Sequence, residues 1–162
     1  MHFDFENVDF NNLVYIPAVA YSEFRELKIP KDVNILNPLS KKHPFYKVLE
    51  NQIHVSDLYQ DFDGIDVTSK FEEGFKYITR DYRWSLLSER RSINSNTFYL
   101  AKLKQLVYGC CKFIEQKKID TLISAGIPHC IETWAFTSLL ETIYSGRIYI
   151  IDYSPIPGFV SI

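Results

Sequence analysis

The fold of this chain is decided by the stretch KKIDTLISAGIPHCIETWAFTSLLETIYSGRIYIIDYSPIPGFVSI, residues Lys117–Ile162. The short apolar run Thr121–Ala125 ends at a Gly-Ile-Pro turn, which predicts a strand. The segment Cys130–Tyr144 is apolar on most sides, as in a well-covered helix, and Gly146 is expected to end it at the C′ position. The nearly continuous apolar run Arg147–Tyr153 is typical of a buried parallel strand. Together these segments predict one right-handed βαβ unit.

Upstream segments extend the same α/β pattern. Pro17 inside the first strand indicates an edge position or a strand that stops there. Ser69 and Glu72 fit a capping box at a helix start. The elements expected upstream are strands over Asn12–Ala20, over Asp32–Leu36 and from Ile53, and helices from Pro44, from Ser69 and over Thr97–Lys117. We therefore predict a Rossmann-like open, mostly parallel sheet with helices on both faces.

The length and composition set the class of protein. A chain of 162 residues fits one Rossmann-like domain, residues 1–162. Because the chain stops soon after a buried-type strand, we expect it to be the N-terminal part of a larger protein. The net charge is −2, so the chain lacks the excess of positive charge that is typical of proteins that bind nucleic acid. There is no signal-like start and no apolar run long enough to span a bilayer, so the expected location is cytoplasmic.

Several functional signatures are missing from the sequence. It contains no G-x-G-x-x-G and no Walker loop, which disfavours a dinucleotide enzyme, a P-loop enzyme and a small nucleotide-binding regulator. It also contains no G-x-S-x-G elbow of an α/β-hydrolase. The three cysteines, Cys110, Cys111 and Cys130, lack metal-ligand spacing and are expected to be buried thiols. We predict neither a bound metal nor a resident cofactor.

The first candidate site lies where the strand over 121–125 gives way to the next helix. His129 stands at this junction and Glu132 follows in the first helical turn. An imidazole there can bind a sugar hydroxyl or act as a general base, and Glu132 can orient it. The pattern fits equally well a His129 that caps the helix and a Glu132 that complements its dipole.

Two further groups of polar residues are candidates for substrate binding. Arg80 and Arg83, together with Arg90 and Arg91, can bind phosphate or acidic sugar groups, although a solvated face paired with carboxylates explains such a run as well. Residues Asp152–Ser154 follow the last long strand, where parallel sheets place ligand contacts. Asp and Ser in that position are also common loop-capping residues.

The second half of the chain resembles the amino-terminal region of bacterial surface or capsular polysaccharide biosynthesis proteins, a GT-B-like glycosyltransferase family. The resemblance rests on Pro128-His129 and Glu132 after a hydrophobic strand, and on the run SPIPG, Ser154–Gly158, after the next strand. The aromatic and arginine stretch RDYRW, Arg80–Trp84, before a long helix is also similar.

This resemblance implies one Rossmann-like half of a two-domain GT-B-like transferase. The expected ligand is a sugar acceptor or a nucleotide sugar, the latter as co-substrate, and a second GT-B-like domain or subunit would complete the enzyme. His129 and Glu132 would be the catalytic residues, and the substrate would contact Pro128, Arg80, Arg83, Asp152 and Ser154. This chain has no second domain, so activity of the isolated chain is not expected. The alternative is a non-catalytic binding or interaction module of the same fold.

Overall fold

The computed structural model describes residues 12–17, 33–38, 41–42, 51–61, 69–80, 96–128, 130–153 and 160–161. Its strands form one sheet in the order β3-β2-β1-β4-β5-β6. The first five strands are parallel, and β6 pairs antiparallel with β5. This confirms the predicted Rossmann-like open, mostly parallel sheet. The strands are β1 Leu13–Ile16, β2 Asn34–Asn37, β3 Gln52–His54, β4 Thr121–Ala125, β5 Arg147–Tyr153 and β6 Val160–Ser161.

The strand β1 lies in the interior of the sheet, between β2 and β4. It ends at Ile16, directly before Pro17. The proline therefore stops the strand, as one of the two predictions has it, and does not mark an edge strand. Every residue of β1 is buried, which explains its uninterrupted apolar sequence. Burial also raises the pKa of Tyr15 to about 12.

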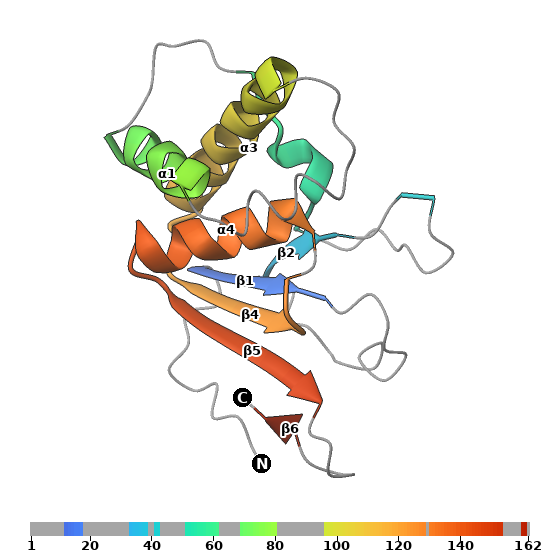
Figure 1. The fold of residues 1–162 in the computed structure, drawn as a ribbon. Coiled ribbons are helices and arrows are strands. Elements are labelled where there is room, and N and C mark those ends of the chain that lie inside the picture. The colour runs from blue at the N-terminus through green and yellow to red at the C-terminus, as the bar shows by residue number, and fades with distance from the viewer. Residues whose placement is uncertain are drawn as a thin grey trace.

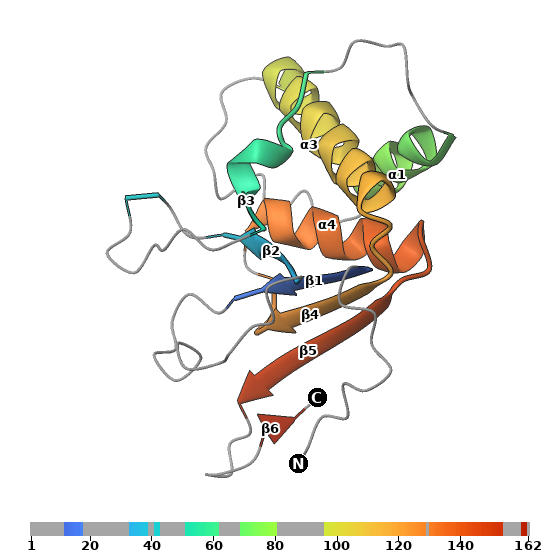
Figure 2. The ribbon, with the colours of Figure 1, turned by 180° about the vertical axis from the view of Figure 1, so that it is seen from behind.

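The described helices pack on one face of the sheet, and the helices predicted for the other face do not occur among the described residues (Figure 1). They are α1 Ser69–Arg80, α3 Asn96–Gln116, α4 Ile131–Thr142 and the 3-10 helix η3 Val55–Leu58. In both views α4 lies directly on the strands, and α1 and α3 lie on its outer side (Figures 1 and 2). Ten consecutive residues of α4, Ile131–Leu140, are buried between these layers. On the opposite face of β1, Leu13 and Tyr15 are buried as well, so the interior strands are covered on both faces.

The end of α4 differs from the sequence prediction. The helix ends at Thr142, and the positive φ of 55° that follows belongs to Ser145, not to Gly146. Glycine is required at 146 for a different reason, because an added Cβ would lie 2.6 Å from Cγ of Leu140. The close contact lets the chain turn tightly from the helix into β5.

The described helices give no membrane-spanning candidate. Within the described ranges, none combines the length and the apolar character that a bilayer crossing requires.

Candidate functional site

The candidate site lies where the winding of the sheet reverses. From β1 the chain adds β2 and then β3 on one side, and it returns to place β4 on the other side of β1. The carboxyl ends of β1 and β4 lie side by side, with Ile16 paired to Ser124 (Figure 1). Open α/β sheets bind their ligands at such a switch point. The loop 126–128 and the start of α4 lie at this point. The sequence predicted a site at the carboxyl end of β4 but not the strand order that makes it a switch point.

The loop after β4 is tightly turned and open on its outer side. The hydroxyl of Ser124 donates a hydrogen bond of 2.6 Å to the carbonyl oxygen of Gly126. Gly126 has a φ of +107°, and apart from its two chain neighbours no described residue has an atom within 4 Å of the position that a Cβ would occupy. Ile127 is 58% exposed, and Pro128, a predicted substrate contact, is half-buried. The Ile127 side chain is therefore the most accessible part of this loop among its described residues.

The first turn of α4 carries a buried carboxylate. Cys130 is the N-cap of the helix, and Glu132 in the first turn is only 8% exposed. The Tyr59 hydroxyl donates a hydrogen bond of 2.8 Å to Oε1 of Glu132. The two residues are 73 positions apart in the chain, and no local sequence signal joins them, so sequence reasoning missed Tyr59. His129 lies outside the described residues, and its pairing with Glu132 stays a prediction.

Two thiols next to Glu132 are held in the protonated form. Burial raises the pKa of Cys110 on α3, and the neighbouring Cys111 and Glu132 raise it further. Burial also raises the pKa of Cys130. Hydrogen bonds with Thr133 lower that pKa, but the effect of burial is larger. A protonated thiol is a poor nucleophile, because the thiolate is the reactive form. The chemistry available around Glu132 is therefore hydrogen bonding and proton transfer by a carboxyl group.

A close backbone contact fixes the position of Tyr59. Tyr59 directly follows η3, and Leu58 at the end of η3 is 1% exposed. A Cβ added to Gly109 on α3 would lie 1.8 Å from the carbonyl oxygen of Leu58. Only glycine at this position lets η3 rest directly on α3. The close packing of η3 against α3 thus sets the distance from Tyr59 to Glu132.

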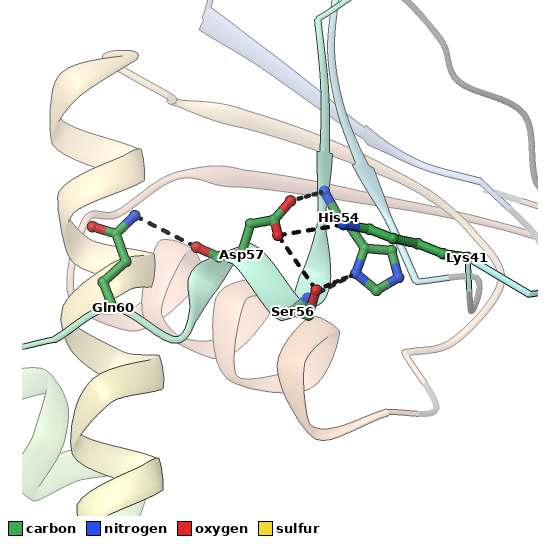
Figure 3. Close-up of polar contacts among 5 residues, drawn as sticks. All are labelled: Lys41, His54, Ser56, Asp57 and Gln60. Carbon is green, nitrogen blue, oxygen red and sulfur yellow. Dashed lines mark hydrogen bonds and ion pairs between the residues drawn. The ribbon is translucent and has the colours of Figure 1, made fainter.

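A second polar cluster lies at the carboxyl end of β3 (Figure 3). His54 Nδ1 accepts the backbone N–H of Ser56 at 3.1 Å and lies 2.6 Å from the Ser56 hydroxyl. Asp57 accepts the backbone N–H of His54 at 3.2 Å and is 3.8 Å from Nζ of Lys41. These bonds form a capping box that starts η3, and they explain why the strand predicted from Ile53 ends at His54.

The same three residue types occur in a Ser-His-Asp triad, but this cluster is built differently. Both contacts from Ser56 reach the same imidazole nitrogen, Nδ1 of His54. Asp57 bonds the backbone of His54 and the Ser56 hydroxyl, and in a triad the carboxylate holds the imidazole itself. The cluster is therefore a helix cap and not a nucleophile with its base.

The remaining predicted site residues are only partly placed. Arg80 is the last residue of α1 and is exposed, and no contact among the described residues joins it to Glu132. Asp152 lies in β5, paired in register with Ser161 of β6 and one strand away from the switch point. Arg83 and Ser154 lie outside the described residues, as do Arg90 and Arg91.

The described part of the chain brings together no group of three or more metal-ligating side chains. Comparison of the chain with models of protein families, with curated proteins and with solved structures found no match. The switch point and the residues around Glu132 are therefore the features of this structure that indicate a function.

Proposed function

We propose that this chain is a glycosyltransferase-related domain of surface polysaccharide biosynthesis, which binds a sugar acceptor or a nucleotide sugar at the carboxyl ends of β1 and β4. The observation that carries the proposal is the buried carboxylate of Glu132 beside the open loop of Gly126 at the switch point. Carboxylates at such positions accept hydrogen bonds from ligand hydroxyls. The resemblance of the surrounding motif to polysaccharide biosynthesis proteins supports a sugar as that ligand.

The reaction of such a domain is transfer of a sugar from an activated donor to a hydroxyl group. The acceptor oxygen loses its proton to a base as it bonds to the anomeric carbon, and the bond from that carbon to the donor phosphate breaks. His129 is the proposed base and Glu132 its orienting partner. Arg80 and Arg83 would meet the negative charge of the leaving phosphate, and Pro128, Asp152 and Ser154 would contact the sugar. A second GT-B-like domain or subunit would supply the rest of the enzyme.

Ligand binding by the isolated chain tests this proposal. UDP-glucose, GDP-mannose and dTDP-rhamnose serve as probes in saturation-transfer NMR and calorimetry. Glu132→Gln keeps the size of the side chain and an acceptor for Tyr59, but it removes the charge. We expect it to weaken binding at least tenfold, because hydrogen bonds to charged groups contribute about 1.5–3 kcal/mol.

The matched control is Glu141→Gln. Glu141 lies near the opposite end of α4 and is exposed, so the same chemical change there should leave affinity within about twofold, as surface substitutions usually do. If none of the three probes binds the wild type, a nucleotide sugar is not the ligand of this domain. If a probe binds and Glu132→Gln binds it like Glu141→Gln, the proposed site is wrong.

The alternative, an interaction module without catalysis, has less support in the described residues. Their exposed large apolar side chains are Leu100, Ile127 and Tyr149, which belong to α3, to the loop after β4 and to β5. Apolar residues that are exposed singly on different elements are ordinary for a globular protein. Of these three, Ile127 lies at the switch point itself, where it would contact a ligand.

A further inference from the structure

We propose that Tyr59 is a positioning residue for Glu132, which holds the carboxylate in one orientation at the start of α4. This inference rests on the proposed function of the switch point. It adds a residue from the segment after β3 to the catalytic pair that the sequence predicts, His129 and Glu132. Tyr59 acts through Glu132, and its own contact with a ligand is not part of the inference.

The contact between the two side chains is short and partly buried. The phenol donates to Oε1 of Glu132 at 2.8 Å, and Glu132 is 8% exposed. A carboxylate that leaves water loses its hydration, and a direct donor is needed to offset that loss. A hydrogen bond to a charged acceptor is also shorter and stronger than one between neutral groups. The bond therefore restricts the side chain of Glu132 as well as stabilising its charge.

Tyr59 can orient Glu132 because Tyr59 is itself held in place. Leu58, the residue before it, is in the core, and its carbonyl oxygen rests against α3 at Gly109. Lys102 of α3 places its Nζ 5.9 Å from the centre of the Tyr59 ring. Two residues later in the chain, Asp61 accepts a hydrogen bond of 2.8 Å from Gln105, which is also on α3. The segment 58–61 is thus attached to α3 on both sides of Tyr59.

A fixed carboxylate improves ligand binding by lowering the cost of ordering. A free Glu side chain must lose rotamer freedom when a hydroxyl binds to it, and that loss reduces affinity. In this chain the folding of η3 on α3 has already ordered the carboxylate of Glu132. Removing the Tyr59 hydroxyl should therefore weaken a ligand that bonds to Glu132, although Tyr59 does not touch that ligand.

The experiment compares Tyr59→Phe with a matched control, Tyr144→Phe. The Tyr144 hydroxyl also donates a 2.8 Å hydrogen bond to a glutamate, Glu115, but this contact is exposed and Tyr144 follows the end of α4 that is opposite the switch point. The first readout needs no ligand and follows the carboxyl carbon resonance of Glu132 by NMR as a function of pH. The other titratable groups known to face Glu132 are the thiols of Cys110 and Cys130.

We expect the midpoint of the Glu132 titration to rise by about one pH unit in Tyr59→Phe, because the lost donor favoured the charged carboxylate. Tyr144→Phe should leave this midpoint unchanged. The second readout is affinity for UDP-glucose, GDP-mannose and dTDP-rhamnose. Tyr59→Phe should weaken binding about tenfold, and in the Glu132→Gln background it should cause no further loss.

The outcomes separate the inference from the proposed function. An unchanged Glu132 titration in Tyr59→Phe overturns the positioning role, whatever the ligand. A changed titration together with unchanged affinity in Tyr59→Phe also overturns it, provided that Glu132→Gln weakens binding. A changed titration with no binding of any probe to the wild type supports the link between Tyr59 and Glu132 and refutes a nucleotide sugar as the ligand.

Discussion

Replacement of Gly109 by alanine should disturb the structure more than its single methyl group suggests. The added Cβ would lie 1.8 Å from the carbonyl oxygen of Leu58 and 2.7 Å from its carbonyl carbon. Carbon atoms of this kind do not approach other heavy atoms closer than 3.0 Å, so the two backbones must separate by about 1.2 Å. The obstacle is main chain on both sides and cannot rotate away. η3 must therefore move off α3 and carry Tyr59 with it.

The change in the free energy of unfolding has three contributions, of which one stabilises and two destabilise the protein. Alanine in the interior of α3 gains about 1 kcal/mol of helix propensity over glycine. Overpacking costs about 1–3 kcal/mol, and a shift of about 1.2 Å would also stretch the 2.8 Å bond from Tyr59 to Glu132 beyond hydrogen-bond range. Loss of a hydrogen bond to a charged group costs about 1.5–3 kcal/mol. We expect a net destabilisation of about 1.5–5 kcal/mol.

The assay is urea unfolding followed by tryptophan fluorescence, with Gly74→Ala as the control. Gly74 is also inside a helix, α1, but its added Cβ would meet Cδ2 of Leu139 at 2.7 Å, the far end of a flexible side chain. Since that methyl can move, Gly74→Ala should stay within about 1 kcal/mol of the wild type. If Gly109→Ala proved as stable as Gly74→Ala, the close seat of η3 on α3 would be refuted.

Two further predictions concern the loop after β4 and the buried thiols. In Gly126→Ala the new methyl group meets no described side chain, but the residue has a φ of +107°. We expect the free energy of unfolding in urea to fall by about 1–2 kcal/mol because of this backbone strain alone. An unchanged urea midpoint would contradict the conformation of this loop. Burial raises the pKa of Cys111 from 9.0 to about 11, so the folded state retains this proton more strongly than the unfolded state does. The resulting stabilisation is complete below pH 9 and is lost as the pH rises towards 11. The urea midpoint of the wild type should therefore fall between pH 9 and pH 11. The midpoint of Cys111→Ala should fall less over the same range.

Much of the fold could be predicted from local sequence patterns. The strands Thr121–Ala125 and Arg147–Tyr153 have the bounds that their continuous apolar runs predict. The long helix Asn96–Gln116 is displaced by one residue from the predicted Thr97–Lys117. Such elements are readable because side chains that alternate or recur every three to four residues face a common core. A prediction that depended on one glycine, the C′ role of Gly146, was wrong because packing against Leu140 selects that residue.

The sequence by itself determined that this chain forms an α/β sheet and that polar groups follow the strand Thr121–Ala125. Only the tertiary structure decided that β1 lies between β2 and β4, which makes that strand end a switch point. It also decided that Tyr59 meets Glu132, since a bond across 73 residues exists only when η3 has settled on α3. Propensity and periodicity act over a few residues. Contacts between distant segments depend on how buried surfaces fit together, and no short window of sequence carries that information.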